Sequence, residues 1–530
     1  MREIALGMNV VNFDIGMKQF SRQEQIQQVV VTAEQMRVIE DRVLAAGMPV
    51  AALMEKVAGL IVRRILELYP LASNKSLVGI LVGPGHNGGD ALVVARELHF
   101  RGFKVNIYCP FSNLKELTAQ HAEYARSLGI KVFKQVEYLA DCDLIIDGLF
   151  GFGLERAIAS PLTEAITQIN QWQKQVFSID LPSGLHTDTG EVLGIAIKAT
   201  KTFCLGLWKL GLLQDAAWEY VGKVELIDFD LPLADIESVV SIAPRVKRVV
   251  ASEAIAHLPL IRPLITHKYQ QGHLLLICGS SRYAGAAILA GLGARASGVG
   301  MLSIAVPESI KPLLVAQLPE ALIIGCPETP TGAIAELPKV DLNALTAIAC
   351  GPGLTIEAQG VVAQVLASDR LLILDADGLN ILALGNVLQL KQRQGATVLT
   401  PHAGEFKRLF PQIPHHGQDR LTAVRTAAEL TGAVILLKGA KTAIADATGT
   451  VNIIAESTPA LARGGSGDVL TGLLGGLAAA SGGDALLSLT ASAAWWHAQA
   501  GILAAQERTE LGVDAVTLSQ YLIRVLQNGK

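Results

Sequence analysis

The stretch LVGILVGPGHNGGDALVVARELHF, residues 77–100, decides the fold class of the first half of the chain. Residues 77–82 form a short apolar run of the kind that makes a buried strand, and residues 91–100 carry apolar side chains at helical spacing. The glycine-rich loop GPGHNGGD lies between them, so a strand, a tight loop and a helix follow one another. This order predicts a βα unit of a parallel α/β sheet.

Similar units follow along the rest of the chain. A helix pattern begins after Thr32, a residue that can cap it. Short apolar runs that we predict to be strands lie at residues 105–109, 143–146 and 176–179, and again at 273–278, 301–305, 346–350, 371–374, 396–399 and 433–437. The glycine loops of the two halves differ, so the pattern favours two unlike α/β domains over an internal repeat.

Length supports the same division. A single hydrophobic core stops growing beyond roughly 250–300 residues, and this chain has 530. Residues 231–250, where Pro232 and Pro244 lie, interrupt the alternation. We therefore predict an N-terminal extension at 1–29, a first domain at 30–238, a linker at 239–249 and a second domain at 250–530.

Composition excludes several classes of protein. Hydrophobic residues make up 50% of the chain and charged residues 17%, which excludes a disordered chain. With 44 basic and 48 acidic residues there is no basic excess for nucleic acid. The six cysteines are scattered without a CxxC pair, which is typical of reduced core thiols. Residues 285–306 are apolar but contain Arg295, so no stretch reads as a membrane span and we expect a cytoplasmic protein.

Three strand-end loops of the first half carry polar side chains and glycines. They are GPGHNGGD (83–90), DGLFGFGLERAI (147–158) and IDLPSGLHTDTG (179–190). Ligands bind at the carboxyl edge of such sheets, so we expect the loops to form one pocket whose oxygens suit a hard cation or a polar ligand. A lone Asp after a strand can also be a simple helix cap. Lys209, in the apolar segment TFCLGLWKLGLL, is either an edge residue or a functional cation.

These motifs, together with LMEKVAG (53–59), resemble the YjeF N-terminal type of NAD(P)H-hydrate epimerase over residues 30–235. The resemblance implies a Rossmann-like three-layer α/β/α domain and a K⁺ ion held by Asn87, Asp147 and Ser183. Asp180 and Lys209 are the candidate catalytic residues for proton transfer. The resemblance assigns hydrated dinucleotide binding to His86, Asn87, Gly88, Gly89, Asp90, Gly151, Phe152, Gly153, Leu154, Glu155, Arg156, Ala157 and Asp180.

The segment ARGGSGDVLTGLLGGL (462–477) is the most informative part of the second half. Backbone amides at the start of a helix can hold developing phosphate charge. Asp468 is then placed to accept a proton from a substrate hydroxyl. A plain glycine-rich helix cap is the alternative. Further strand-end loops are GPGL (351–354), LDADGLN (374–380), LTPHAGEF (399–406) and LLKGAKTAIA (436–445), where two lysines and exposed amides suit nucleotide phosphates.

In this order, and with HKYQQGHLLLICGSSRYAGA before them, these segments resemble the ribokinase-like ADP-dependent NAD(P)H-hydrate dehydratases over residues 250–525. The resemblance implies a ribokinase-like α/β domain that uses Mg²⁺ with ADP. It assigns substrate contacts to Ala286, Gly353, His402 and Asp468, and ADP or AMP contacts to Lys438, Gly439, Ala440, Lys441, Thr442 and Gly467.

The two resemblances meet in the bifunctional NAD(P)H-hydrate repair enzymes. They imply that the first domain interconverts the R and S epimers of hydrated NADH and NADPH, and that the second dehydrates the S form and releases AMP and phosphate. We expect a homo-oligomer with no nucleic-acid or membrane partner. Two alternatives stay open at this point: a vitamin-type kinase in the second domain, and a non-catalytic binding module in the first.

Overall fold

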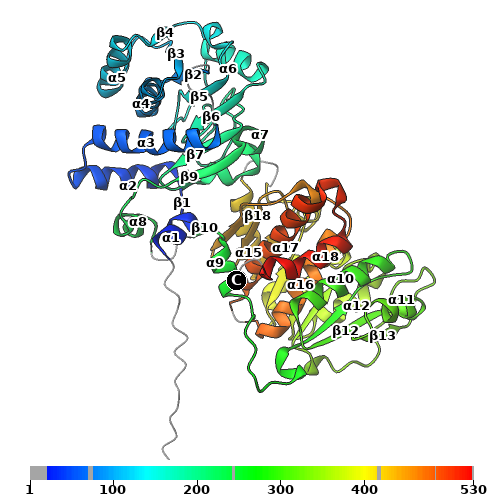
Figure 1. Cartoon of the computed structure of the whole chain (residues 1–530). Coiled ribbons are helices and arrows are strands. Elements are labelled where there is room, and N and C mark those ends of the chain that lie inside the picture. Colours follow the sequence, from blue (N-terminus) through cyan, green and yellow to red (C-terminus); the bar gives the residue numbers. More distant parts are fainter. Residues whose placement is uncertain (1–20, 70–75, 242–244, 415–418, 484, 528–530) are drawn as a thin grey trace, which may run out of the picture.

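The computed structural model describes residues 21–69, 76–241, 245–414, 419–483 and 485–527. Residues 1–20 of the predicted extension lie outside these ranges. Figure 1 shows two α/β bodies, the N-terminal half above and the C-terminal half below, with α1, α8 and β10 between them.

The N-terminal body is built on a parallel seven-stranded sheet in the order β4-β3-β2-β5-β6-β7-β9. The strands are β2 (Leu77–Val82), β3 (Lys104–Tyr108), β4 (Lys131–Phe133), β5 (Leu144–Gly148), β6 (Gln175–Ile179), β7 (Lys201–Leu205) and β9 (Lys223–Ile227). The chain reverses direction across the sheet between β2 and β5, so the loops after these two strands border the crevice where ligands bind in such sheets.

Helices cover both faces of this sheet and make it the three-layer domain that we predicted. Along β5, Leu144 and Ile146 belong to one core and Ile145 to the other, as the alternation of a strand requires. The helices on the first face are α2 (Ala33–Ala45), α3 (Val50–Leu68), α4 (His86–Phe100) and α5 (Glu116–Ser127), and α6 (Leu162–Gln171) covers the second. Helices α7 (Trp218–Val221) and α8 (Leu233–Val240) follow.

The first residues of α2 and α4 show how the local sequence determines where a helix begins. Thr32 caps α2, as predicted, by accepting a hydrogen bond from the backbone N–H of Gln35, whose side chain bonds back. Helix α4 begins at His86, five residues before the apolar pattern. Gly88 permits this early start, because a methyl group there would overlap the carbonyl oxygen of Gly83.

The C-terminal body is a ten-stranded sheet in the order β10-β19-β18-β17-β16-β15-β14-β11-β12-β13, antiparallel only at β17-β18-β19. The strands are β10 (Val246–Arg248), β11 (His273–Ile277), β12 (Met301–Pro307), β13 (Leu322–Cys326), β14 (Ala347–Cys350), β15 (Leu371–Leu374), β16 (Thr397–Leu399), β17 (Val434–Leu437), β18 (Thr442–Ala445) and β19 (Val451–Ile454). Here the direction reverses between β11 and β14.

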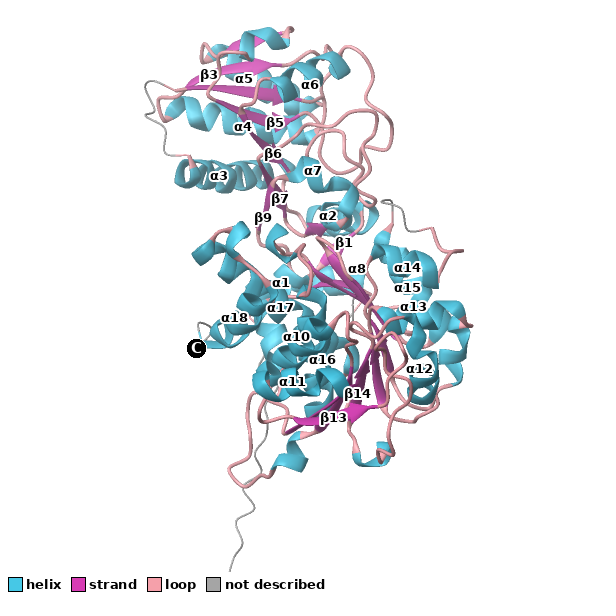
Figure 2. Cartoon of the chain, turned by 90° about the vertical axis from the view of Figure 1, so that its right-hand side faces the viewer, coloured by secondary structure: helices cyan, strands magenta, loops and turns pink. Residues whose placement is uncertain are grey.

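Figure 2 shows helices on both faces of this sheet as well. One face carries α10 (Ala284–Ser297), α11 (Lys311–Gln317), α16 (Ser466–Ser481), α17 (Leu486–Arg508) and α18 (Ala515–Gln527), and the other α12 (Gln359–Leu366), α13 (Asp377–Leu384), α14 (Ala403–Leu409) and α15 (Arg420–Thr431). Helix α9 (Ala251–Ala256) precedes them. A methyl group at Gly472 of α16 would overlap the carbonyl oxygen of Ala290, so α10 and α16 pack backbone to backbone.

The structure adds detail at both predicted boundaries. Within the predicted extension lies α1 (Arg22–Gln28), capped by Ser21, and the short β1 (Val30–Val31) pairs with β8 (Trp208–Lys209). Within the predicted linker lies β10, which joins the C-terminal sheet beside β19. A three-residue edge strand reading VKR lacks the apolar run by which strands are recognised in sequence.

Within the described ranges, a backbone bridge between Val29 and Lys247 and several polar side-chain contacts join the two bodies. The guanidinium of Arg248 lies 4.7 Å from the ring centre of Trp208, and Arg420 donates a 2.6 Å hydrogen bond to Asp215. The ammonium of Lys441 lies 4.8 Å from the ring centre of Trp218. The N-terminal body therefore contacts the loop between β17 and β18 of the C-terminal body.

All six cysteines are buried and unpaired, as their spacing predicted. Among the described residues, no single helix has the length and apolar character needed to cross a membrane; only the pair α2 and α3, bent by 120°, passes that test jointly.

Candidate active sites

A cavity of about 560 Å³ lies at the carboxyl edge of the N-terminal sheet, at the point where the strand order reverses. Its wall is built from α2, α3, the loops after β2, β5 and β6, and β8. Of the predicted dinucleotide contacts, the wall includes His86, Asn87, Asp90, Gly151, Phe152, Gly153, Leu154 and Asp180. Gly88 and Gly89 are buried in the first turns of α4, and Glu155, Arg156 and Ala157 are exposed outside the wall.

Asp147 lies at the end of β5, fully buried behind the cavity. Its two oxygens accept hydrogen bonds from the hydroxyl of Ser178, the backbone N–H and hydroxyl of Ser183, and the backbone N–H of Leu149, at 2.6–3.2 Å. Burial raises the pKa of Asp147, although these bonds oppose the shift. Within the described ranges it forms no ion pair, so this carboxylate lacks a counter-cation from the protein.

Lys209 and Asp180, the two predicted catalytic residues, form a buried ion pair with 2.6 Å between Nζ and Oδ1. Their side chains are 0% and 4% exposed. Lys209 also donates to the carbonyl of Leu205, and Asp180 Oδ2 accepts from the backbone N–H of Phe152 at 2.9 Å. Burial disfavours the ammonium, but Asp180, Cys204 and Glu40 together outweigh this effect and raise the pKa of Lys209.

Asp180 itself has a φ of +68°, in the left-handed region that a residue with a side chain rarely adopts. Its backbone N–H donates to the carbonyl of Phe203 at 2.8 Å, which ties this conformation to β7. The strained backbone therefore holds the Asp180 carboxylate against both Lys209 and the loop after β5.

Glu40 is a cavity residue that the sequence reasoning missed. It follows Ile39 of the apolar stripe of α2, which is the signal that could have found it. Burial, together with the charges of Asp180 and Asp41, raises the pKa of Glu40 to about 7 despite the opposing charge of Lys209. Asp90 of α4 belongs to the same wall, and burial together with Asp180 and Glu40 raises its pKa well above the ordinary value.

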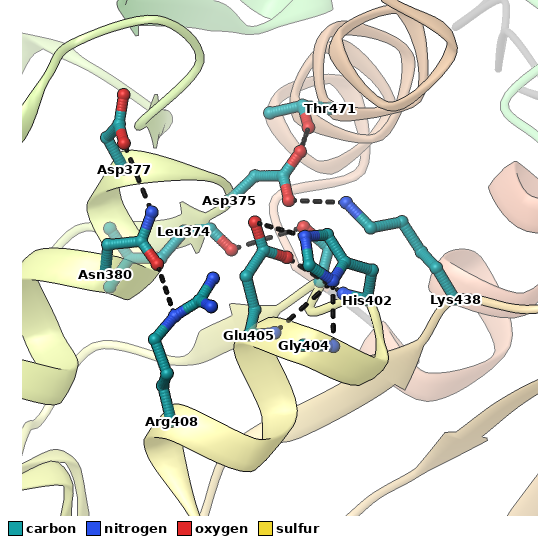
Figure 3. A network of polar contacts seen from close by, with 11 residues as sticks. Leu374, Asp375, Asp377, Asn380, His402, Gly404, Glu405, Arg408, Lys438 and Thr471 are labelled. Atoms are coloured by element: carbon teal, nitrogen blue, oxygen red, sulfur yellow. Dashed lines mark hydrogen bonds and ion pairs between the residues drawn. The ribbon is translucent and has the colours of Figure 1, made fainter. Parts of the chain in front are cut away.

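The second site lies at the carboxyl edge of the C-terminal sheet (Figure 3). Asp375 follows β15, and its two oxygens accept hydrogen bonds from Lys438 Nζ at 2.7 Å and from the hydroxyl of Thr471 at 2.6 Å. Burial disfavours the ammonium of Lys438, yet the charges of Asp375 and Glu405 raise its pKa overall. Lys438, one of the predicted nucleotide contacts, is thus paired with Asp375 of the predicted strand-end loop LDADGLN.

Asp468 lies in the first turn of α16, directly beside this pair. Burial, reinforced by the charge of Asp375, raises the pKa of Asp468 to about 7, while Lys438 opposes the shift. A methyl group at the neighbouring Gly467 would lie 3.4 Å from Lys438 Nζ. The structure therefore brings together Asp468, Gly467 and Lys438, which the sequence placed in two separate motifs.

The other predicted substrate contacts lie on neighbouring strand ends. Gly353, after β14, is adjacent to Ala286 of α10, because a methyl group at Gly353 would approach the Ala286 methyl to 2.9 Å. His402 caps α14 with its Nδ1, which accepts from the backbone N–H of Gly404 at 2.9 Å. Its backbone is bridged to Lys438, so His402 joins the same edge as Asp375 (Figure 3).

The loop from Lys438 to Thr442 is arranged differently from the prediction of two phosphate-facing lysines. Lys441 Nζ donates to the carbonyl of Ala455 at 2.6 Å and lies against Trp218 of the N-terminal body. Arg420 donates to the carbonyls of Leu437 and Lys438, so the loop backbone is fixed from behind. Gly439 and Ala440 are exposed, and the Thr442 hydroxyl donates to the carbonyl of Gly439 at 3.2 Å. The described residues contain no group of three His, Cys, Asp or Glu that could hold a metal.

Comparisons with known proteins match both halves of the chain. Residues 50–211 match the YjeF-related protein N-terminus family, and residues 274–524 match the family described as NAD(P)H-hydrate dehydratase. A Synechocystis protein named bifunctional NAD(P)H-hydrate repair enzyme Nnr is 56% identical over 495 residues, covering 93% of this chain and 94% of its own. Proteins of the same name from Gloeobacter violaceus and Thermofilum pendens are 48% and 34% identical over 94% and 91% of this chain, and over 97% and 93% of their own.

Among solved structures, the ADP/ATP-dependent NAD(P)H-hydrate dehydratase from Bacillus subtilis, co-crystallised with ATP and Mg²⁺, is 34% identical to this chain. The match covers 53% of this chain and 98% of that one, with a TM-score of 0.46.

Proposed function

The chain belongs to the family of bifunctional NAD(P)H-hydrate repair enzymes, and from this membership we propose how its two sites divide the reaction. The N-terminal domain, proposed at 30–238, interconverts the R and S forms of hydrated NADH and NADPH. The C-terminal domain, proposed at 250–530, dehydrates the S form with ADP. The observation that carries this proposal is the 56% identity to a bifunctional relative along 93% of the chain.

In the dehydratase, Asp468 is proposed to take the proton from the C6 hydroxyl of the hydrate. The hydroxyl oxygen then attacks the β-phosphorus of ADP, and AMP leaves with the bonding electron pair. Backbone amides at the start of α16, around Gly465 and Gly467, are placed to stabilise the developing phosphate charge. Phosphate then departs from C6 as the neighbouring carbon loses a proton, which restores the reduced nicotinamide.

Mg²⁺ is proposed to accompany ADP, since this ion usually binds through one or two carboxylates and the substrate phosphates. Asp375, a buried carboxylate at this edge of the sheet, is already paired with Lys438 and Thr471. The steps proposed for dehydration therefore rely on Asp468 and the backbone amides.

The pH dependence of dehydration tests the role of Asp468. Only the ionised carboxylate can accept a proton, and the pKa of Asp468 is raised to about 7. We expect kcat/KM to rise about tenfold per pH unit below 7 and to level off above it. Initial rates of NADH recovery at saturating ADP between pH 5.5 and 8.5 measure this; a flat profile down to pH 5.5 would exclude Asp468 as the base.

In the epimerase, C6 carries both the ring nitrogen and the hydroxyl oxygen. Loss of the hydroxyl proton can form a carbonyl as the C6–N1 bond breaks, and reclosure on the other face inverts C6. Asp180 and Lys209 are proposed to set the charge of the site during proton transfer. The loops after β2 and β5 are proposed as the cradle of the dinucleotide. His86, whose pKa is lowered by burial and by Lys115, is proposed to contact it as a neutral side chain.

A K⁺ ion fits the residues behind this cavity. The carboxylate of Asp147 is completely buried and forms no ion pair within the described ranges. Asn87, Asp147 and Ser183 are proposed to hold the ion through their oxygens. It would supply the missing positive charge and keep the loops after β2, β5 and β6 together.

Removal of K⁺ is expected to slow epimerisation by about 10-fold to 100-fold, the range typical when support of a metal site is lost. The measurement compares epimerisation in K⁺ with epimerisation in tetramethylammonium at equal ionic strength. Dehydration of pure S hydrate in the same buffers is the control. An Asp147→Asn variant should lose the K⁺ response; equal epimerisation rates of the wild type in both salts would contradict the site.

The proposed function is tested by mixing the protein with an R and S mixture of hydrated NADH, ADP and Mg²⁺, and following absorbance of reduced nicotinamide. Complete recovery, faster than spontaneous epimerisation allows, supports both activities. A stop after the S fraction would leave the N-terminal domain without the proposed activity. No recovery would favour the kinase alternative. The homo-oligomer and the cytoplasmic location remain predictions; six unpaired buried cysteines suit a reducing compartment.

A further inference from the structure

Glu40 is a titratable side chain in the wall of the N-terminal cavity to which neither the sequence nor the family resemblance assigns a role. It is half-buried on α2 and borders the cavity together with Lys209 and Asp180. Within the described ranges of the chain, the carboxyl group of Glu40 makes no hydrogen bond or ion pair. Its carboxyl group is therefore available to a molecule bound in the cavity.

The side chains of Lys209 and Asp180 are less available than Glu40 for exchanging a proton with a bound molecule. The 2.6 Å ion pair and the donation to Leu205 engage the ammonium, which is completely buried. The Asp180 oxygens accept from Lys209, from the backbone N–H of Phe152 and, at 3.4 Å, from that of Leu205. Taking a proton from this pair would leave an uncompensated buried charge, which is costly.

The charges around Glu40 favour exchange of a proton near neutral pH. Lys209 of β8 favours its ionised form, whereas burial, Asp180 after β6 and Asp41 on its own helix favour the protonated form. Asp90 of α4 faces the same group, and its high pKa reflects the charges of Asp180 and Glu40. Arg37 and Lys115 complete the charged part of the cavity wall. A general acid and base works best with a pKa near the working pH.

We propose that Glu40 takes the proton from the C6 hydroxyl of the bound hydrate and returns it after inversion. This role rests on the proposed epimerase function. As the O–H bond breaks, its electron pair forms the C6 carbonyl, and the C6–N1 electron pair moves onto the ring nitrogen. Rotation about the C5–C6 bond and reclosure reverse each step, so no oxidant or co-reactant is consumed. The Lys209–Asp180 pair stabilises the ionised state of Glu40 through the charge of Lys209.

The test is a Glu40→Gln variant of the full chain, with Glu34→Gln as the matched control. Glu34 is an exposed carboxylate on α2 that lies outside the cavity wall. We expect Glu40→Gln to lower kcat for epimerisation by about 100-fold or more with little change in KM. Glu34→Gln should stay near the wild-type rate, and Glu40→Asp should recover part of the activity. The rise of the wild-type rate with pH near 7 should vanish in Glu40→Gln.

Each of these measurements can overturn the role. Epimerisation by Glu40→Gln at the wild-type rate would do so, and so would an equal loss in Glu34→Gln. Loss of activity together with a lower unfolding midpoint of the N-terminal domain, without recovery in Glu40→Asp, would reduce Glu40 to a structural residue. A wild-type chain that dehydrates the S hydrate but does not accelerate epimerisation would contradict the proposed function itself.

Discussion

Replacing Asp468 by Asn is expected to slow ADP-dependent dehydration by about 100-fold to 10,000-fold, the usual contribution of a positioned general base. The amide keeps the size of the side chain but cannot accept the hydroxyl proton. The variant retains the Lys438–Asp375 pair and the packing of α10 on α16, so the loss should fall on kcat rather than on KM for ADP. Recovery of NADH from pure S hydrate measures it.

The same chain supplies two controls for this experiment. Epimerisation by Asp468→Asn should remain at the wild-type rate, because Asp468 lies in the other domain. Asp514→Asn changes another aspartate next to a helix start, where its carboxylate accepts from the backbone N–H of Thr517 at 2.7 Å. Asn serves equally well in such a position, so this variant should dehydrate normally. Dehydration by Asp468→Asn near the wild-type rate would refute the base assignment.

Replacing Lys209 by Met is expected to have the largest effect on the N-terminal domain. The substitution leaves the carboxylate of Asp180, which is 4% exposed, without a cationic partner. Removing one partner of a buried pair destabilises a protein by about 3–5 kcal/mol. Epimerisation should be lost at the same time. Urea unfolding followed by hydrogen exchange of peptides from residues 76–241 reports this domain.

A double variant separates stability from activity. Lys209→Met combined with Asp180→Asn removes both charges and should recover most of the lost stability, while epimerisation stays absent. Lys201→Met is the matched control, because Glu225, the partner of Lys201, keeps its bonds to Arg64. If Lys209→Met unfolds like Lys201→Met, the buried pair has little importance for the fold.

Much of the sheet architecture was predictable, because parallel strands buried on both faces are short apolar runs. The predicted runs at 77–82 and 371–374 coincide with β2 and β15, and the others differ by a residue or a few at their ends. Nine strands were not recognised: β1, β4, β7, β8, β9, β10, β13, β18 and β19. The sequence of β10 is polar, and β18 and β19 form an antiparallel hairpin after the predicted phosphate loop. The start of α4 was placed late because its first turn consists of glycines and polar residues.

Prediction of the sites was uneven for a physical reason. Glycine loops at strand ends are visible in sequence, so Asn87, Asp180, Gly353 and Asp468 were named as candidates. Glu40 comes from a helix that packs over the sheet edge, and only tertiary structure brings it to Lys209. The pairing of Lys438 with Asp375 joins residues 63 positions apart, which no local pattern indicates.

The contacts between the two bodies have a consequence for recombining members of this family. Arg420 spans from Asp215 to the loop carbonyls of Leu437 and Lys438, and Trp218 covers Lys441. A chimera that grafts a foreign N-terminal half onto this C-terminal half inherits the buried Arg420 but keeps its partner only if the graft brings an acid at position 215. Whether the two halves of such a chimera fit together therefore depends more on the charge at position 215 than on the position at which the connecting peptide is cut.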